Sequence, residues 1–417
     1  MTETPVAPSL PHPRGTQETH RLPTQRGCPL SPPKQLAEFQ ATGGPTRLTF
    51  PDGHEGWLLT RYEDIRAALA DPRFSSEFRR LVSPVRESKL TKEDMDGLPF
   101  RRSMIATDPP DHTRLRRMVT GQFTVRRMRQ LEPWIGSVVD EHLDAMAEHG
   151  GPIDLVQALA LPVPSLVICQ LLGVPYEDRA GFQDRTATLL GLDSTREELL
   201  DAIHGMDDYM LELVRAKQAD PTDDLLSDVV RATPIGAPLT EEELVGIGNI
   251  LLIAGHETTA NMLGLSTFAL LRERARWEEL REHPELVEKA VEELMRHLSI
   301  IQFGLVRTVK APVELGGVTL QPDETVVLHI PAGNRDPEQF PNPDELDFHR
   351  PTNRHLGFGH GVHQCLGQQL ARVEMRAALG KLIQRFPDLR LAVPADEVPF
   401  RDDMGIYGVH QLPVTWG

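Results

Sequence analysis

The sequence predicts a mainly α-helical protein with small, segregated β-sheets. Apolar residues recur at helical spacing over long stretches, above all between residues 108 and 213, 240 and 274, and after Gly367. Strand-like patterns are confined to short runs near residues 46–60 and 313–330, and no internal repeat is present. With 417 residues, 40% of them hydrophobic and 25% charged, the chain has the composition of a globular enzyme with a sizeable core.

The first 33 residues are expected to form a disordered leader, and residues 34–417 a single domain. The leader is rich in proline and lacks an apolar stretch of signal-peptide or anchor length. The longest apolar stretch of the chain, residues 244–271, is interrupted by Asn249, His256 and Glu257, which argues against a membrane span. The only cysteines are Cys28, Cys169 and Cys365, too few and too far apart for a disulfide framework, so a cytoplasmic protein is expected.

Local signals predict the order of the smaller elements. Residues 46–60 read as a hairpin whose turn is Pro51-Asp52-Gly53, followed by a short helix over residues 61–70. Residues 74–104 are irregular and predict a long functional loop. A second hairpin is predicted over residues 313–320, with another strand over 325–330.

A long helix is predicted from Thr240 to Arg274, starting at a capping box made by Thr240 and Glu243. It is apolar on nearly every face, which predicts that it runs through the interior. The polar run Ala254-Gly255-His256-Glu257-Thr258-Thr259 interrupts it. Burying a carboxylate costs several kcal/mol unless it is paired, and glycine inside a helix costs about 1 kcal/mol more. The run is therefore either a helix kink with an internal salt bridge or an oxygen-binding notch beside a cofactor.

The run Phe358-Gly359-His360-Gly361-Val362-His363-Gln364-Cys365-Leu366-Gly367 is the most informative segment. Its glycines permit backbone to approach a large planar ligand. An amphipathic helix follows, so Cys365 lies near a helix N-terminus, where unpaired N–H groups stabilise an anionic sulfur. This pattern favours a thiolate that faces a flat cofactor.

The run resembles the haem-ligand loop of the cytochrome P-450 monooxygenases, and the resemblance extends from about Leu36 to Trp416. It implies a cytochrome P-450 fold, a triangular prism of helices around a long central helix. It also implies haem b, with Cys365 as the axial thiolate to the metal and Phe358 and Gly359 beside the cofactor. The segment at Glu257-Thr258 resembles the oxygen-activation motif of the same family. By that resemblance Glu257 relays protons, and Thr258 holds the iron-bound oxygen species by hydrogen bonding.

The family resemblance assigns further residues. Glu293 and Arg296 match its ExxR pair, with Arg350 as the third member of a structural triad. The haem propionates are expected to meet His112, Arg116, Arg307 and His363. Candidates for the distal substrate pocket are apolar and suit a large lipophilic ligand: Ile250, Ile253, Ala254, Phe303 and Ile406.

Charge narrows the partners. A net charge of −17 disfavours nucleic acid and anionic membranes. Between Arg101 and Arg129, however, eight arginines stand against two aspartates, a local balance of +6. This stretch is either a solvated helix face or a docking patch for an acidic electron-transfer partner combined with an internal anion site.

Within the resemblance we expect a monomer that uses O2 and takes electrons from a separate ferredoxin and ferredoxin reductase. The expected reaction is hydroxylation or epoxidation of a polyketide, macrolide, statin precursor, secosteroid or xenobiotic. Three alternatives stay open: a peroxide-driven haem oxidase, a haem-binding sensor without turnover, and a cysteine hydrolase that uses Cys365 with His363 or His360 as base.

Overall fold

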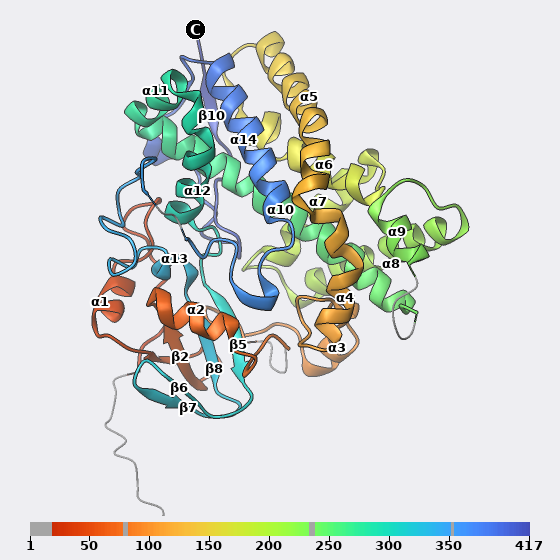
Figure 1. The fold of residues 1–417 in the computed structure, drawn as a ribbon, viewed down its shortest axis with the longest axis vertical. Helices are drawn as coiled ribbons and strands as arrows, with labels where there is room; N and C mark the ends of the chain where they lie inside the picture. Colours follow the sequence, from red (N-terminus) through yellow and green to blue (C-terminus); the bar gives the residue numbers. More distant parts are fainter. Residues whose placement is uncertain (1–18, 78–81, 233–237, 352–353) are drawn as a thin grey trace, which may run out of the picture.

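The protein is built mainly from helices, and its largest sheet lies at one end of the molecule (Figure 1). This computed structural model describes residues 19–77, 82–232, 238–351 and 354–417. The predicted mainly helical fold with small sheets is confirmed. The helices are α1 (Gln35–Ala41), α2 (Tyr62–Ala70), α3 (Lys92–Asp96), α4 (Asp111–Thr120), α5 (Val125–His149), α6 (Pro162–Leu172), α7 (Arg179–Leu190), α8 (Arg196–Ala219), α9 (Leu225–Arg231), α10 (Glu241–Arg272), α11 (Arg274–Glu282), α12 (Val287–Leu298), α13 (Ile330–Gly333) and α14 (Gln368–Arg385).

The strands of the described residues form three sheets. The largest has the order β1-β2-β8-β5-β3, with β2 parallel to β8 and the other pairs antiparallel. The predicted hairpins are confirmed as β1 with β2 and as β6 with β7. The strands are β1 (Thr46–Thr49), β2 (Glu55–Leu59), β3 (Phe74–Ser75), β4 (Ile153–Asp154), β5 (Leu305–Val309), β6 (Val313–Leu315), β7 (Val318–Leu320), β8 (Thr325–Leu328), β9 (Arg390–Leu391) and β10 (Pro413–Thr415).

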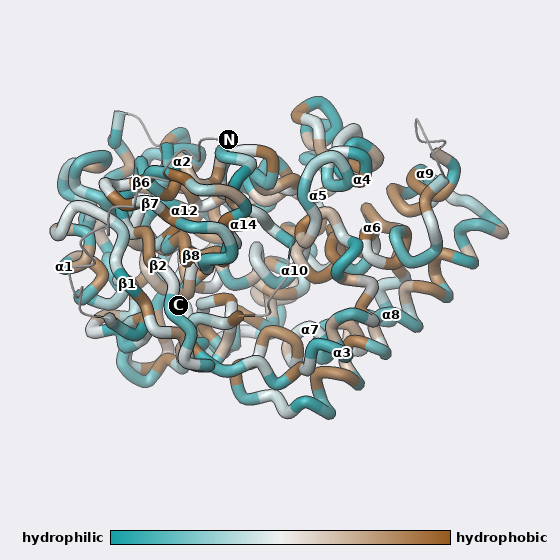
Figure 2. The backbone as a smooth tube through the Cα atoms, turned by 90° about the horizontal axis from the view of Figure 1, so that it is seen from below, coloured by the Kyte–Doolittle hydropathy of each residue, from teal (hydrophilic) through white to brown (hydrophobic). Residues whose placement is uncertain are grey.

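Helix α10 is the central element, as its sequence predicts. Its capping box is present: the Glu243 N–H donates to the Thr240 hydroxyl at 3.2 Å, and the Thr240 N–H donates to the Glu243 carboxylate at 3.0 Å. Almost every residue of α10 is buried, and Figure 2 shows the helix crossing the middle of the molecule. Each fully buried Leu, Ile or Phe contributes about 1.5–3 kcal/mol to folding, so α10 organises the core.

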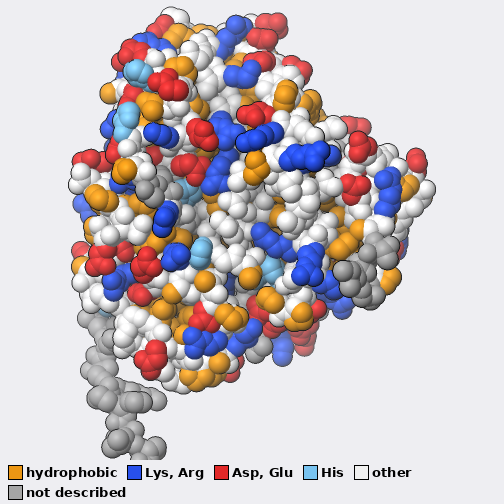
Figure 3. Space-filling view, viewed as in Figure 1, with side chains coloured by type: hydrophobic (Ala, Val, Ile, Leu, Met, Phe, Trp, Pro, Cys, Tyr) orange, Lys and Arg blue, Asp and Glu red, His pale blue; other side chains and the backbone are white. Residues whose placement is uncertain are grey.

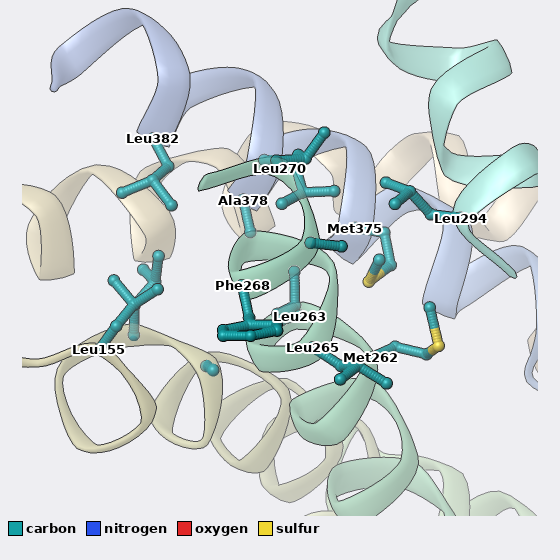
Figure 4. Close-up of a cluster of buried hydrophobic side chains, with 14 of the residues drawn as sticks. Leu155, Met262, Leu263, Leu265, Phe268, Leu270, Leu294, Met375, Ala378 and Leu382 are labelled. Atoms are coloured by element: carbon teal, nitrogen blue, oxygen red, sulfur yellow. The ribbon is translucent and has the colours of Figure 1, made fainter. Parts of the chain in front are cut away.

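The two halves of α10 pack into different clusters. Its C-terminal half joins residues of α12 and α14, including Phe268, Leu294 and Ala378, which Figure 4 shows together. Its N-terminal half packs with α6 and α8 through residues such as Leu252 and Met210. The polar run predicted to interrupt the helix lies between these two clusters.

Two segments differ from the sequence-based expectation. Residues 74–104 contain β3, which joins the large sheet, and α3, which starts at a capping box of Thr91 and Asp94. Of the expected leader, residues 1–18 lie outside the described residues. Residues 19–33 pack on the body, since Leu30 is buried and the Arg26 guanidinium lies 3.8 Å from the centre of the Tyr407 ring. The expectation of disorder is therefore wrong for residues 19–33, while the single domain over 34–417 stays a prediction.

Candidate active site

The cysteine loop is a tight turn held by its own backbone. The Cys365 N–H donates to the Phe358 carbonyl at 2.8 Å. Gly359 and Gly361 have φ angles of +68° and +72°, which glycine adopts without strain. A Cβ at Gly361 would lie 2.3 Å from the Leu69 carbonyl oxygen, whereas one at Gly359 would meet nothing closer than 4.0 Å. One glycine therefore lets the loop pack on the chain itself, and the other leaves an open side.

The Cys365 thiol is enclosed by protein but open on one side. The residue is exposed, yet burial raises the pKa of its thiol. Two kinds of group lower this pKa without outweighing burial: backbone N–H groups, of Gly367 and Gln368, and positive charges, of Arg116 and Arg372. The predicted stabilisation by the helix N-terminus is thus present but insufficient by itself. A metal cation bound to the sulfur would supply the missing positive charge.

A partly buried ionic network contacts the loop through Phe358. The Arg372 guanidinium lies 4.4 Å from the centre of the Phe358 ring and donates two hydrogen bonds to Glu292, at 2.6 and 2.9 Å. His355 contacts the same carboxylate at 3.2 Å. Burial opposes ionisation of Glu292, but the hydrogen bonds from His355 and Arg372 prevail and lower its pKa to about 2. Sequence reasoning missed this network, which fixes the orientation of Phe358.

One face of α10 is open in the middle of an otherwise buried helix. Ala254 is exposed and Thr258 is half-buried, although their neighbours His256, Glu257 and Thr259 are buried. Because Ala254 and Thr258 are four residues apart, they lie on the same face. The Thr258 hydroxyl donates to the Ala254 carbonyl at 2.8 Å. A threonine inside a helix commonly donates to the carbonyl one turn earlier in this way. The hydroxyl oxygen of Thr258 can still accept a hydrogen bond from a group on the open face.

Glu257 lies on a different face of α10 and is ion-paired. Its Oε1 contacts the Arg401 guanidinium and accepts a hydrogen bond from the Asn261 amide at 3.2 Å. Successive helical residues project about 100° apart, so the acid is turned away from the face that carries Thr258. The predicted acid and alcohol are neighbours in the chain, but among the described residues their side chains bond to different partners, Thr258 to the Ala254 carbonyl and Glu257 to Arg401 and Asn261. Arg401, the partner of the acid, was not predicted.

The four residues expected to meet the propionates come together. The rings of His112 and His363 lie 4.2 Å apart, and the Arg116 guanidinium donates to the Gln364 carbonyl at 2.5 Å. Burial lowers the pKa of His363 to about 3, with the charges of His112, Arg307 and Arg116 acting in the same direction. Burial likewise lowers the pKa of Arg307 to about 10.

This cationic cluster has unused hydrogen-bonding capacity. Among the described residues, neither ring nitrogen of buried His112 has a partner, and Arg307 donates only to the adjacent Val306 carbonyl, at 2.8 Å. The nearest acid, Asp108, is already bonded to Ser75 and Lys310, at 2.6 and 2.9 Å. Two carboxylates of a ligand would satisfy such a cluster, and with the open thiol and the open face of α10 these residues fit a haem.

The predicted pocket residues come from three different hydrophobic clusters. Ile250 and Ile253 pack with α6 and α8. Phe303 packs beside the large sheet, and Ile406 belongs to the C-terminal loop, where it is bridged to Ile301. Ile250, Ile253 and the exposed Ala254 belong to α10 itself, whereas Phe303 and Ile406 come from separate segments.

The ExxR triad is present, with Glu293 and Arg296 fully buried and Arg350 partly buried. Arg296 donates to both carboxylate oxygens of Glu293, at 2.8 and 2.7 Å, and Arg350 donates to the same carboxylate at 3.2 Å. Its position among α12 and the segment before the cysteine loop makes it a structural support.

No helix among the described residues combines the length and the apolar character that crossing a lipid bilayer requires.

Comparison with known proteins gives a consistent result. The family description "Cytochrome P450" matches residues 192–413. Cytochrome P450-SU2 of Streptomyces griseolus is 45% identical over 390 residues, which cover 94% of this chain and 95% of that protein. The mycinamicin VIII C21 methyl hydroxylase of Micromonospora griseorubida is 42% identical and covers 94% of this chain and 99% of its own. The crystal structure of CYP105P1 in complex with filipin I superimposes with a TM-score of 0.90 at 42% identity, covering 96% of this chain and 99% of that one.

Proposed function

This chain belongs to the cytochrome P450 family, and from that premise we propose that it hydroxylates an unactivated C–H bond, or epoxidises a C=C bond, of a large lipophilic secondary metabolite. It is a monooxygenase whose cofactor is haem b, bound through a cysteine thiolate. Membership of this family gives no support to the cysteine-hydrolase and sensor alternatives.

Cys365 is our candidate for the haem ligand. The observation that carries this assignment is the Cys365 thiol, which is enclosed by protein and open on one side. Its loop is held by its own backbone and by the ionic network of Arg372, Glu292 and His355. The cationic cluster of His112, Arg116, Arg307 and His363 would bind the propionates, with Phe358 and Gly359 against the macrocycle. When bound, the haem-thiolate activates dioxygen with two electrons and two protons, and one oxygen atom enters the substrate.

Residues of α10 would manage the protons. The Thr258 hydroxyl is oriented by the Ala254 carbonyl and lies on the open face, where it can hold or pass on a proton at its oxygen. Glu257 is the neighbouring acid, and after it leaves Arg401 it would return a proton to the Thr258 hydroxyl. Small Ala254 leaves space on this face for the reacting groups.

The substrate class follows from the apolar candidates for the pocket. Ile250, Ile253, Ala254, Phe303 and Ile406 are apolar and come from α10 and two other segments, and a pocket that they line would suit a bulky lipophilic molecule. One similar protein is named mycinamicin VIII C21 methyl hydroxylase, and another was crystallised in complex with filipin I.

Electrons would come from a separate ferredoxin and its reductase to a monomeric, cytoplasmic enzyme. Part of the predicted arginine patch is already used, because Arg114 is paired with Glu243 and Arg102 with Glu242. Arg117, Arg126 and Arg129 are exposed, and no ion pair is found for them among the described residues. Figure 3 shows basic side chains gathered over the middle of the face where α4, α5 and α14 lie in Figure 1. This face would receive an acidic ferredoxin close to the cysteine loop.

The assignment of Cys365 is tested by Cys365→Ser. We expect the variant to lose the red-shifted band of the reduced carbon monoxide complex, which marks thiolate ligation. Cys169→Ser is the matched control, since that cysteine is buried in the core and should leave the band in place. A normal band in Cys365→Ser would overturn the assignment. In a separate experiment, compounds that shift the spin state of the haem in the wild-type protein would identify the substrate class.

A further inference from the structure

Glu257 is held by a residue from a distant part of the chain. Arg401 provides its ion-pair partner, and the two side chains are only 13% and 7% exposed. The Arg401 Nε has no hydrogen-bond partner among the described residues. A buried pair with an unused donor is incompletely satisfied. Arg401 therefore orients the carboxylate with part of its guanidinium unused, and the Asn261 amide adds one hydrogen bond to the same carboxylate, at 3.2 Å.

Arg401 belongs to a loop that is anchored in the interior. Its N–H donates to the Gly408 carbonyl at 3.0 Å. The Gln302 amide donates to the carbonyls of Arg401 and Met404, at 3.3 and 2.5 Å. The loop also carries Ile406, a candidate for the substrate pocket. A substrate that presses on this loop would therefore act close to Arg401.

The same loop is joined to the connection between α7 and α8. The Leu192 N–H donates to the Asp403 carbonyl at 2.8 Å, and the Gly405 N–H donates to the Leu190 carbonyl at 2.7 Å. These two bonds flank a bridge between Gly191 and Met404. The α7–α8 connection and the Arg401 loop thus form a short antiparallel pair, so a displacement of one would be passed to the other.

The α7–α8 connection is in turn tied to the segment 86–94 by polar contacts. The Lys89 ammonium donates to the Asp193 carbonyl at 3.0 Å, and the Arg86 guanidinium donates to the Leu192 carbonyl. Arg196 forms a two-bond ion pair with Asp94, at 2.8 and 2.5 Å. Polar contacts at the surface contribute little to stability because water competes for the same groups, so these contacts can open and close.

We propose that Arg401 is a positioning residue that restrains Glu257 and makes the release of this acid depend on the α7–α8 connection. The inference rests on the proposed role of Glu257 in proton delivery. In the arrangement described here the guanidinium keeps the carboxylate off the face of Thr258. Displacement of the loop, by substrate or by opening of the contacts to residues 86–94, frees the acid to turn toward Thr258.

The restraint is tested with Arg401→Met, Arg401→Lys and Glu257→Gln. Without the guanidinium the Glu257 carboxylate is free to turn toward Thr258, so Arg401→Met should raise substrate-free NADPH oxidation severalfold and increase the peroxide released per NADPH in the presence of ethoxyresorufin, a lipophilic probe. It should also shift the C–O stretching band of the reduced carbon monoxide complex, which reports polarity beside the haem. Arg401→Lys should restore most of the wild-type behaviour, and Arg401→Met in a Glu257→Gln background should add nothing.

The role of Glu257 and the role of Arg401 can be tested separately. If Glu257→Gln matches the wild type in oxidation rate and peroxide yield, the proposed role of Glu257 is wrong. If Glu257→Gln changes both but Arg401→Met changes neither them nor the C–O band, the inference on Arg401 is wrong.

The link to the α7–α8 connection is tested with a matched pair of variants. Arg196→Gln breaks the ion pair to Asp94, whereas Arg215→Gln breaks another two-bond ion pair of the same helix, to Glu241 at 3.1 Å. We expect Arg196→Gln to raise substrate-free NADPH oxidation and Arg215→Gln to leave it unchanged. Equal behaviour of the two variants would contradict the link.

Discussion

Two buried arginine–glutamate pairs differ in how completely their polar atoms are used. Arg296 and Glu293 are 0% and 1% exposed. Arg296 donates to both oxygens of Glu293 and to three backbone carbonyls, at 2.7–3.0 Å, and Arg350 adds a second cation. Arg401 contacts one oxygen of Glu257 and leaves its Nε unpaired within the described structure.

The difference separates a permanent support from a movable one. A buried ion pair offsets its desolvation only when the remaining donors and acceptors are satisfied, and the pair at Arg296 meets this condition. The pair at Arg401 does not, and it connects α10 to a loop rather than two turns of one helix. We therefore expect substitutions in the first pair to affect stability and substitutions in the second to affect turnover.

The largest expected effect is at Arg296. Removing one partner of a buried pair costs about 3–5 kcal/mol, so Arg296→Met should unfold at much lower urea concentration and bind little haem. Arg296→Lys should fail as well, because an ammonium cannot supply the five hydrogen bonds of the guanidinium fork. Lysine should be tolerated at position 401, and a stable Arg296→Lys variant would remove the contrast between the pairs.

Glu374 shows what a buried acid experiences without an arginine. Burial raises its pKa to about 8, against a smaller opposing effect of Thr259. Because the folded-state pKa lies above the unfolded value near 4.5, the stability that this group contributes is fully present below pH 4.5 and is lost as pH rises toward 8. Each pH unit in this window changes the free energy of unfolding by up to about 1.4 kcal/mol.

Glu374→Gln should therefore remove part of the pH dependence. Between pH 5 and pH 7 the wild type should lose up to about 2.7 kcal/mol relative to the variant, which urea titrations at the two pH values would measure. Glu288→Gln, at an exposed position of α12, serves as the control and should follow the wild type. Parallel curves for the wild type and Glu374→Gln would show that Glu374 is ionised in the fold at neutral pH.

The contrast also explains what could be predicted from the sequence. The capping box at Thr240, the glycines around Cys365 and the spacing of Glu293 and Arg296 are local patterns, and each predicted its element or cluster. Arg401, and the network of Glu292, His355 and Arg372, depend on long-range folding, for which no local spacing is diagnostic. Residues 19–33 were misjudged because their proline content favours disorder, whereas buried Leu22 and Leu30 hold them on the body.

A smaller effect is expected at Thr258, beside the movable pair. Thr258→Ala removes the hydroxyl from the open face of α10 and should lower the product formed per NADPH by about tenfold. This is less than the contribution of a typical positioned acid–base group to the rate. Thr258→Ser keeps the hydroxyl and should retain most of the coupling. Urea stability should be nearly unchanged in both. Unaltered coupling in Thr258→Ala would count against the role of this face in proton transfer.

The smallest expected effect lies on the exposed arginines, where neither kind of buried pair is involved. Arg126→Glu places a negative charge on the face proposed to receive ferredoxin. It should raise the KM for a surrogate ferredoxin severalfold and weaken the salt dependence of the rate, because exposed charges act mainly on association. Arg390→Glu makes the same charge change on β9, in the sheet that contains the C-terminal strand, and should leave KM unchanged. Equal KM values for the two variants would move the docking surface away from α4 and α5, while the contrast between the two buried pairs would stand.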